Sequence, residues 1–322
     1  MDDITVLVLA DPAEPQLAML KTLPGSRSVA VGNTPEAFAG AAAQAGVILH
    51  WSASLEVFEQ VWRMAPRVRW VHSLSAGLDG VLFPALVESP VPLTNARGVF
   101  SGMLGEFAIG AMLFFAKGFR RLVRSQMAEV WEEFDTIELR NQTVGIVGYG
   151  DLGRAVAWRA HALGMKVLAL RRRPELSRDD GCVQQIFTPD KMREMLARCD
   201  YVVASMPLTP ESRGIIGPAE IEAMKPSAIL INIGRGSVVD EPALIRALER
   251  KRIQGAALDV FETEPLPAGH PFYKLENVLL SPHSADHARD WKERTMQVFL
   301  ENFERFRRGE PLANLVDKKI GY

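Results

Sequence analysis

The chain has 322 residues, of which 48% are hydrophobic and 24% charged, with a formal net charge of −2. This length can hold two domains, and this hydrophobic content excludes a disordered chain. A near-neutral chain lacks the basic surface that binding to nucleic acid or an acidic membrane needs, so neither is expected as a partner. No apolar run reaches the roughly twenty residues of a membrane span. The acidic start Met1-Asp2-Asp3 is unlike a secretory signal, so a cytoplasmic location is expected.

Cysteine usage is sparse, with Cys182 and Cys199 as the two cysteines of the sequence. They form no CxxC pair, so they offer neither a disulfide framework nor a set of zinc ligands. Two reduced thiols and no bound metal are expected.

The N-terminal third alternates short apolar segments with helix-like segments. Strands are predicted at Ile4 to Leu9, Gly46 to His50 and Val68 to His72, and helices at 36–45 and 55–63. This alternation is typical of a parallel α/β layer. Because the glycine-rich turn described below lies near the middle of the chain, this layer is predicted to form a separate domain.

Two longer helical patterns flank the middle of the chain. Residues 101–126 form one and residues 286–308 the other, although core packing alone explains their apolar stripes equally well. If the second helix packs back on the N-terminal layer, the segment between the two helices is an inserted domain. The expected domains are then 1–100 with 289–322, and 101–288.

Residues 144–154, Val-Gly-Ile-Val-Gly-Tyr-Gly-Asp-Leu-Gly-Arg, run from an apolar strand through a glycine-spaced turn into a helical pattern. This pattern is typical of a turn that binds the pyrophosphate of a dinucleotide, although a plain strand-to-helix turn is the alternative. Gly148 permits the tight turn, Gly150 lets the cofactor approach, and Gly153 lets the helix pack on the strand. The helix N-terminus offers free N–H donors. The predicted cofactor contacts here are Gly148, Gly150, Asp151, Leu152 and Gly153.

The next predicted strand, 166–170, indicates which cofactor binds. Arg171 stands where an NAD-binding unit usually has Asp or Glu for the ribose diol, and Arg172 and Arg173 follow. Guanidinium groups form charge-assisted bonds to phosphate, whereas a carboxylate would repel a 2′-phosphate. We therefore expect NADP(H) to be preferred, with NAD(H) possible. An exposed basic turn that accepts either cofactor is the alternative.

Three later segments each join a predicted strand to polar residues at its carboxyl end, where open α/β sheets bind their ligands. The first ends at Arg235, which suits a carboxylate, and the third ends at His283, which can carry a proton. The second holds Asp259 and Glu264, and Glu264 can orient a histidine. Taken singly, each residue also fits an ordinary surface position.

In this order the motifs resemble the D-isomer-specific 2-hydroxyacid dehydrogenase family over nearly the whole chain. The likeness rests on segments 147–153, 206–214, 232–240, 258–265 and 281–283. It implies an α/β fold in which a Rossmann dinucleotide-binding domain is inserted in a flavodoxin-like substrate domain. It also implies an oxidoreductase that reduces a small 2-oxo acid, such as glyoxylate, hydroxypyruvate or a pyruvate-like acid, to the D-2-hydroxy acid with NAD(P)H.

By this resemblance His283 is the general acid and base, Glu264 hydrogen-bonds it, and Arg235 holds the 2-oxo acid. Hydride addition to a ketone leaves an alkoxide that needs a proton, and a carboxylate beside an imidazole favours the protonated form that donates it. Asp259 is implied to face the nicotinamide. The further predicted cofactor contacts are Met206, Pro207, Ser212, Ile233, Gly234, Arg235, Asp259, His283 and Ala285.

The N-terminal layer is predicted to contribute substrate contacts. Ser75, Ala76 and Gly77 form a small-residue loop after a predicted strand, and the resemblance implies that its backbone N–H groups receive the substrate carboxylate. A tight turn is the alternative. Trp51 follows the strand that ends at His50 and is predicted to line the substrate pocket, although a buried core tryptophan is equally compatible.

Several points stay open. Residues 284–287 replace the small, glycine-containing segment usual in the family, a departure that bears on the floor of the nicotinamide pocket and on the choice of substrate. A homodimer through the dinucleotide-binding domain is expected, and residues 130–134 lie either in that contact or in internal packing. The alternative functions are a dinucleotide-sensing, corepressor-like binding protein and a phosphite dehydrogenase, which keeps the same three residues Arg235, Glu264 and His283.

Overall fold

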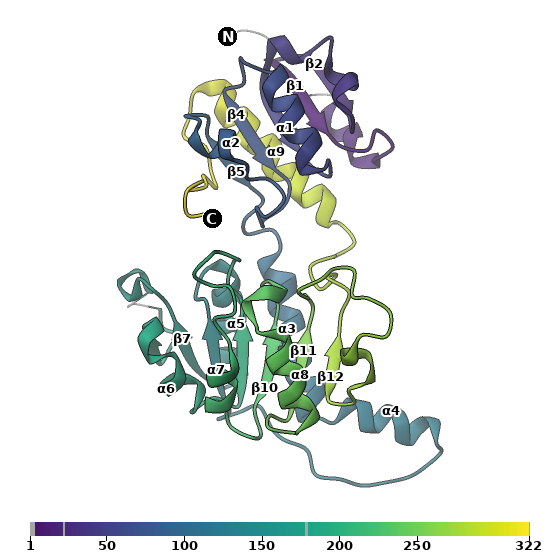
Figure 1. Cartoon of the computed structure of the whole chain (residues 1–322), viewed down its shortest axis with the longest axis vertical. Helices are drawn as coiled ribbons and strands as arrows, with labels where there is room; N and C mark the ends of the chain where they lie inside the picture. The colour runs from purple at the N-terminus through teal and green to yellow at the C-terminus, as the bar shows by residue number, and fades with distance from the viewer. Residues whose placement is uncertain (1–3, 22, 178–179, 322) are drawn as a thin grey trace. The chain divides into compact units, whose positions relative to one another are not determined.

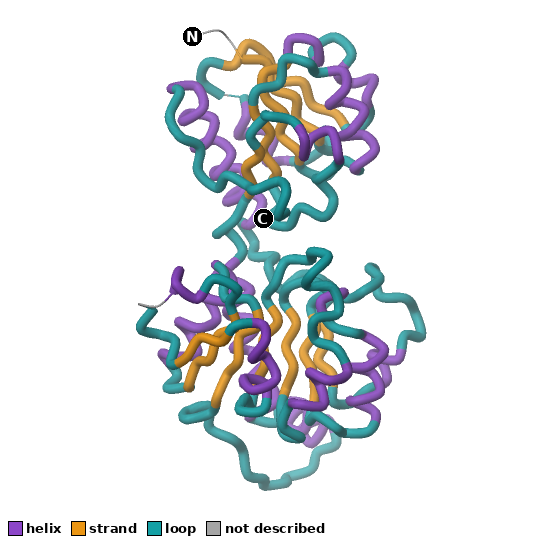
Figure 2. The backbone as a smooth tube through the Cα atoms, turned by 60° about the vertical axis from the view of Figure 1, so that its left-hand side comes forward, coloured by secondary structure: helices purple, strands orange, loops and turns teal. Residues whose placement is uncertain are grey.

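The computed structural model describes residues 4–21, 23–177 and 180–321. The chain divides into two compact units, one formed by Met1–Phe100 with Ala288–Tyr322 and the other by Ser101–His287. We call them the terminal unit and the central unit. Each has its own parallel sheet with helices packed on it (Figure 1, Figure 2).

The terminal unit is built on a five-stranded parallel sheet with the order β2-β1-β3-β4-β5, which is the flavodoxin-like order. Its strands are β1 Ile4–Leu9, β2 Ser26–Gly32, β3 Ala45–His50, β4 Trp70–Ser73 and β5 Leu93–Asn95. β1 and β3 are buried along their whole length, as expected for strands covered on both faces. Its helices are η1 Pro15–Leu20, η2 Pro35–Phe38, η3 Ala42–Gln44, α1 Leu55–Met64, α2 Pro84–Glu88 and α9 Trp291–Arg308.

The last helix of the chain, α9, packs on this N-terminal sheet. Phe299 and Phe303 of α9 are fully buried, and their ring centroids lie 5.5 and 6.5 Å from that of Trp70 on β4. Burying an aromatic side chain of this size contributes about 1.5–3 kcal/mol. The C-terminal segment therefore completes the core of the N-terminal layer.

The central unit is built on a seven-stranded parallel sheet with the order β12-β11-β10-β9-β6-β7-β8. Its strands are β6 Thr143–Val147, β7 Lys166–Leu170, β8 Gln185–Phe187, β9 Tyr201–Ala204, β10 Ile229–Asn232, β11 Gly255–Leu258 and β12 Val278–Leu280. This is the Rossmann order with one further strand, and the order reverses between β6 and β9. The predicted fold class, a Rossmann domain together with a flavodoxin-like layer, is confirmed.

Helices cover both faces of the central sheet. α3 and α5 pack against each other, whereas α7 contacts both α6 and α8 in a second group. The helices are α3 Ser101–Ala116, α4 Phe119–Met127, α5 Asp151–Ala162, η4 Pro174–Ser177, η5 Pro189–Lys191, α6 Met192–Leu196, α7 Pro218–Ala223, η6 Gly236–Val238, α8 Glu241–Glu249 and η7 Pro271–Lys274. Among the described residues no single helix has the length and apolarity to cross a membrane, and α3 with α4 reaches them only as a pair bent by 61°.

The single helical pattern predicted at 101–126 is two helices in the structure. α3 and α4 are separated at Gly118, whose φ of +61° is a conformation that residues with a side chain rarely adopt. A Cβ on Gly118 would also lie 2.9 Å from Cε2 of Phe134. α4 therefore projects from the body of the central unit (Figure 1).

The helix predicted at 36–45 is also wrong. Two 3-10 turns, η2 and η3, replace it, with Gly40 between them. Glycine in the middle of a helix costs about 1 kcal/mol relative to alanine, which favours the interruption. The predicted strands and the helix at 55–63 are confirmed, with boundaries shifted by one or two residues.

His72 of β4 lies in the terminal core with no exposed surface. Its Nδ1 is 2.7 Å from Oγ1 of Thr94, which also accepts a hydrogen bond from Nε1 of Trp70 at 2.9 Å. Its Nε2 has no hydrogen-bond partner among the described residues. Burial lowers the pKa of His72 to about 3, so the imidazole is neutral in the folded protein.

We expect the terminal unit to lose stability as the pH falls below 6.5, the ordinary histidine pKa. In that range His72 binds a proton in the unfolded chain but not in the folded one, so the free energy of unfolding decreases as the pH decreases. From about pH 7.5 to about pH 5.5 the loss due to His72 is about 1.4 kcal/mol. Urea unfolding should show that the free energy of unfolding of His72→Gln decreases less between these two pH values than that of the wild type, by this amount.

The matched control is His161→Gln, because His161 is exposed on α5. It should keep the wild-type pH dependence. An unchanged pH dependence in His72→Gln would contradict a buried neutral imidazole.

Candidate active site

The carboxyl ends of β10, β11 and β12 are joined by backbone hydrogen bonds that continue the strand pairing. The N–H of Asp259 donates to the carbonyl of Asn232 at 3.1 Å, and the N–H of His283 donates to the carbonyl of Asp259 at 2.9 Å. The loops that carry Arg235, Glu264 and His283 therefore leave one edge of the sheet from neighbouring points. This edge is where parallel sheets bind ligands.

Glu264 and His283 form a close pair at this edge. Oε2 of Glu264 lies 2.6 Å from Nδ1 of His283, and Oε1 accepts the backbone N–H of Phe261 at 2.9 Å. Because a carboxylate accepts hydrogen bonds, Nδ1 carries the proton and Nε2 is left for another partner. The side chains of His283 and Glu264 are 42% and 33% exposed, so a ligand can reach the pair.

Asp259 fixes the turn that follows His283. It is 1% exposed, and its Oδ1 accepts the backbone N–H groups of Ser284 at 3.0 Å and Ala285 at 3.1 Å. His283 has a φ of +49°, which is uncommon for a residue with a side chain. The bonds to Asp259 stabilise this strained backbone and thereby orient the imidazole.

The same turn places a second carboxylate near His283. Oδ1 of Asp286 is buried without a hydrogen-bond partner among the described residues, and it lies 3.6 Å from Nε2 of His287. Burial raises the pKa of Asp286, although the nearby His287 and His283 oppose this shift. The unusual segment 284–287 thus lies directly beside the histidine.

Arg235 sits in a turn that Asn232 holds in shape. Nδ2 of Asn232 donates to the carbonyl of Arg235 at 3.0 Å, and its Oδ1 accepts the N–H of Gly234 at 3.1 Å. A Cβ on the next residue, Gly236, would lie 1.9 Å from the carbonyl carbon of Phe261. Only glycine therefore lets this turn lie directly against the loop that follows β11.

Glu241 and His270 form a second carboxylate–histidine pair that was not among the predicted residues. Oε1 of Glu241 lies 3.2 Å from Nε2 of His270, and its Oε2 accepts the N–H of Glu262 at 3.2 Å. Glu241 is the first residue of α8, so the pair ties that helix to the loop that holds Glu264. The residues are far apart in the sequence, and no local pattern joins them.

The predicted glycine turn joins β6 to α5. Gly148 has a φ of +100°, and a Cβ there would lie 2.4 Å from Cγ of Met206. A Cβ on Gly153 would lie 2.6 Å from the carbonyl oxygen of Gly148, so helix and strand are in close contact. A Cβ on Gly150 would meet nothing within 4 Å. Gly150 is also the N-cap residue of α5, and among the described residues no side chain caps the first N–H groups of this helix. These N–H groups can therefore donate to the oxygens of a pyrophosphate group.

The other predicted cofactor contacts lie along the same edge of the sheet. Met206 and Pro207 follow β9, where Oγ of Ser212 donates to the carbonyl of Pro207 at 2.7 Å. Ile233 and Gly234 follow β10, and a Cβ on Gly234 would lie 2.7 Å from the carbonyl oxygen of Met206. Asp151 and Leu152 open α5, and Oγ of Ser101 donates to Oδ2 of Asp151.

Arg171 and Arg172 directly adjoin the glycine turn. The carbonyl of Leu170, at the end of β7, accepts the N–H groups of Gly148 at 3.3 Å and Tyr149 at 3.1 Å. The Arg171 guanidinium donates to Oγ of Ser177. The two arginines therefore follow a strand whose carboxyl end is bonded directly to the glycine turn.

Asp180 was not predicted, yet it lies beside this turn. Its Oδ2 accepts hydrogen bonds from Tyr149 Oη at 2.8 Å and Arg154 Nε at 3.2 Å. Burial works to raise the pKa of Asp180, but the hydrogen bonds from Tyr149, the Cys182 N–H and Arg154 outweigh it and lower the pKa. The negative charge of Asp180 is therefore paired with the positive charge of Arg154.

The predicted substrate contacts of the terminal unit also lie at strand carboxyl ends. Trp51 follows β3, and residues 75–77 follow the neighbouring strand β4. The N–H of Leu74 donates to the carbonyl of His50 at 3.0 Å, so the two loops start from adjacent points. Trp51 is 7% exposed, and Nζ of Lys292 lies 6.0 Å from the centre of its ring.

A pocket of about 470 Å³ borders the Glu264–His283 pair on the central unit. Its other lining residues are mostly apolar: Phe261, Pro265, Leu266, Tyr273, Leu280, Ser281 and Pro282. An apolar wall strengthens charge interactions beside it, because the local dielectric constant is lower than that of water.

Comparisons with known proteins identify the family. The model of the D-isomer specific 2-hydroxyacid dehydrogenase NAD binding domain matches residues 109–285. A glyoxylate reductase from Korarchaeum cryptofilum is 35% identical over 269 residues, which are 81% of this chain and 80% of that enzyme.

Solved structures agree along the whole chain. A D-isomer specific 2-hydroxyacid dehydrogenase from Xanthobacter autotrophicus, in complex with NADPH and MES, is 30% identical with a TM-score of 0.82, and 100% of each chain is covered. An NADPH-dependent glyoxylate/hydroxypyruvate reductase from Sinorhizobium meliloti, in complex with NADP and sulfate, is 27% identical with the same TM-score and coverage. The chain belongs to the D-isomer specific 2-hydroxyacid dehydrogenase family and is an NAD(P)-dependent 2-hydroxyacid dehydrogenase. The family resemblance inferred from the motifs is thus confirmed.

Proposed function

We propose that this enzyme reduces a small 2-oxo acid, of the glyoxylate, hydroxypyruvate or pyruvate type, to the D-2-hydroxy acid with NADPH. The observation that carries the proposal is the 2.6 Å contact between Glu264 and Nδ1 of His283 at the ligand-binding edge of a Rossmann sheet. The relative from Korarchaeum cryptofilum is named a glyoxylate reductase, which supports a small 2-oxo acid as the substrate.

His283 acts as the proton donor in this proposal. The nicotinamide, when bound, supplies the hydride. The substrate oxygen then takes the proton from Nε2 of His283, and Glu264 stabilises the imidazolium through Nδ1. Asp259 acts on the backbone after His283, so it orients the donor.

Substrate binding is assigned to charged and small residues. The Arg235 guanidinium neutralises the substrate carboxylate and polarises the carbonyl that receives the hydride. The backbone N–H groups of Ser75, Ala76 and Gly77 bind carboxylate oxygens, and Trp51 limits the size of the substrate side chain. The domain roles follow: residues 1–100 with 289–322 bind substrate, and residues 101–288 bind the dinucleotide.

Steady-state assays with a panel of 2-oxo acids and NADPH should detect turnover by the wild-type enzyme. His283→Ala should lower kcat by a factor of about 100 to 10,000, because the proton donor is lost. The same variant should keep its NADPH dissociation constant, measured by fluorescence titration. His161→Ala, an exposed histidine on α5, is the matched control and should keep the wild-type kcat.

Failure of every 2-oxo acid to react would favour the corepressor-like binding protein. Oxidation of phosphite with NADP in the absence of 2-oxo acid reduction would favour the phosphite dehydrogenase. An unchanged kcat in His283→Ala would remove His283 from the mechanism.

The preference for NADPH rests on Arg171 and Arg172. Both follow β7, whose last carbonyl is bonded to the glycine turn. The two solved relatives were determined in complex with NADPH and with NADP, which supports the same choice.

Replacing Arg171 and Arg172 by alanine should lower kcat/KM for NADPH by about tenfold or more, since charge-assisted bonds to the 2′-phosphate are lost. The kcat/KM for NADH should change little. Arg193→Ala removes a charge from an exposed position on α6 and serves as the control. A wild-type enzyme that prefers NADH would overturn this assignment.

We also propose that the enzyme is a homodimer through its central unit. α4 has no buried residue. The exposed apolar side chains on α4 and the segment after it are Phe119, Leu122, Val123, Met127, Val130, Trp131 and Ile137. Trp131 is 94% exposed, whereas the ring of Phe134 lies 4.2 Å from the guanidinium carbon of Arg121. Internal packing therefore accounts for Phe134 but not for Trp131, and a second copy of the chain would bury this surface.

Light scattering should give about twice the chain mass of 35.6 kDa. Met127→Asp with Trp131→Asp should shift the mass to that of one chain, because charges would be buried at the contact. Leu55→Asp, at an exposed position on the terminal unit, should leave the dimer intact. A monomeric wild-type enzyme would contradict the proposal.

The cytoplasmic location expected from the sequence stays a prediction.

A further inference from the structure

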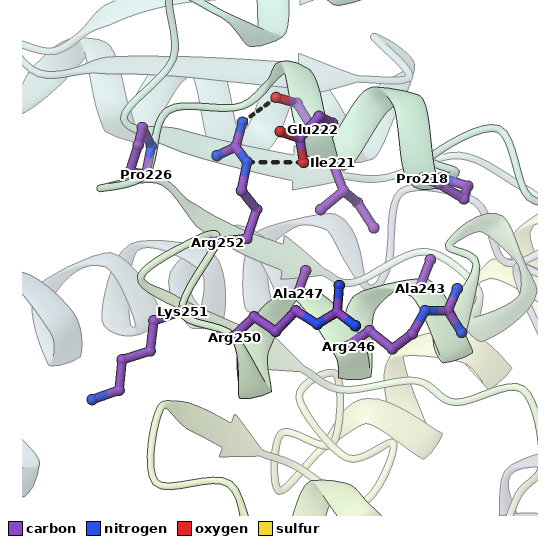
Figure 3. A pocket seen from close by; sticks show the side chains of 10 residues that line it. All are labelled: Pro218, Ile221, Glu222, Pro226, Ala243, Arg246, Ala247, Arg250, Lys251 and Arg252. Carbon is purple, nitrogen blue, oxygen red and sulfur yellow. Dashed lines mark hydrogen bonds and ion pairs between the residues drawn. The ribbon is translucent and has the colours of Figure 1, made fainter.

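A groove of about 570 Å³ runs between α7 and α8 on the central unit (Figure 3). α8 follows β10 and leads into β11, so its last turn lies at the amino ends of these parallel strands. Arg235 and His283 are at the carboxyl ends. The groove is therefore a second concave site at the opposite edge of the sheet from the candidate active site.

The groove is strongly basic in a chain of net charge −2. Its lining has four cationic side chains, Arg246, Arg250, Lys251 and Arg252, and one carboxylate, Glu222, which gives a net charge of +3. Nε of Arg252 lies 3.0 Å from Oε2 of Glu222, and its guanidinium also donates to the carbonyl of Met224 at 3.0 Å. The one acidic group of the lining is therefore already engaged.

In the described part of the chain, Arg246 and Arg250 have no carboxylate partner like the one that Arg252 has in Glu222. Arg246 lies in the last turn of α8 and Arg250 is the C-cap residue four positions later, so the two lie on the same side of the helix end, where like charges repel. Among the described residues no ion pair or side-chain hydrogen bond involves either guanidinium. The C-terminal end of the α8 dipole carries a partial negative charge that favours cations here, but it offsets only part of the charge of two guanidinium groups. Two adjacent, exposed guanidinium groups are thus available to an anion.

The floor of the groove is apolar. Ile221 is 3% exposed, and Ala243 and Ala247 on α8 are buried residues whose small side chains leave room above them. Pro218 and Pro226 complete this surface on the side of α7. A ligand that suits the groove therefore combines an anionic group with an apolar body, as small-molecule sites generally require.

We propose that this groove binds a phosphorylated small molecule. Arg246 and Arg250 hold the phosphate, because guanidinium groups match its oxygens in charge and geometry. Lys251 adds positive charge, and the apolar body of the ligand lies on Ile221, Ala243 and Ala247. The site is separate from the dinucleotide turn, so both can be filled at once.

ATP is a suitable probe, since it joins several phosphates to a flat aromatic base whose face can pack on an apolar surface. Isothermal titration calorimetry on the enzyme saturated with NADP should show one ATP bound per chain, because the dinucleotide turn is then already filled. Arg246→Gln with Arg250→Gln should raise the ATP dissociation constant about a hundredfold, roughly tenfold for each guanidinium.

The control is Lys166→Gln with Lys191→Gln, which removes the same charge from exposed positions on the central unit outside the groove. It should keep the wild-type ATP affinity. If both double variants bound ATP more weakly to the same extent, the attraction of ATP would be due to overall positive charge, and the proposed site would be overturned. A failure to bind ATP would also overturn it, and so would a loss of ATP binding in Arg171→Ala, which would place ATP in the dinucleotide site.

A final experiment tests whether the apolar floor of the groove contributes to binding. Inorganic tripolyphosphate should bind more weakly than ATP, and equal affinity would overturn the proposal of an organic ligand. Circular dichroism should show that the Arg246 and Arg250 variants remain folded, since both side chains are exposed and unpaired among the described residues.

Discussion

The hydrogen bonds of Asp259 are the constraint on which the candidate active site depends. Its backbone joins the ends of β10 and β12, and its carboxylate holds the N–H groups of Ser284 and Ala285. These bonds keep His283 at a φ that its side chain disfavours. The position of the imidazole beside Glu264 thus rests on a buried carboxylate that binds backbone groups. Removing it would leave two N–H groups without their acceptor and release the strained turn.

The other two loops of the site support this arrangement through close backbone contact. Gly236 brings the turn of Arg235 against Phe261, and Phe261 in turn donates its N–H to Glu264. Glu241 adds a further tie from α8 to the same loop. The loops that carry Arg235, Glu264 and His283 are therefore held by one continuous set of contacts within the central unit. Such preorganisation lowers the cost of arranging charges during a reaction.

Local patterns predicted the parts of this site that are local. The glycine spacing from Gly148 to Gly153 marks a turn whose conformation depends on those residues themselves, and alternating strands and helices define the sheet. Family resemblance then picked out Glu264 and His283. The pair of Glu241 and His270 and the bonds of Asp180 join residues distant in the sequence, so no periodicity reveals them. The break at Gly118 was missed because the apolar pattern continues through it.

The conformation of Gly118 also has a consequence beyond its own turn. Its left-handed φ and the ring of Phe134 beside it determine the direction in which α4 leaves the central unit. The absence of a side chain at Gly118 thus sets the direction of α4 and of the exposed apolar side chains that it carries. A side chain at this point would meet both the left-handed backbone and the ring of Phe134, so α4 would have to leave the central unit in another direction.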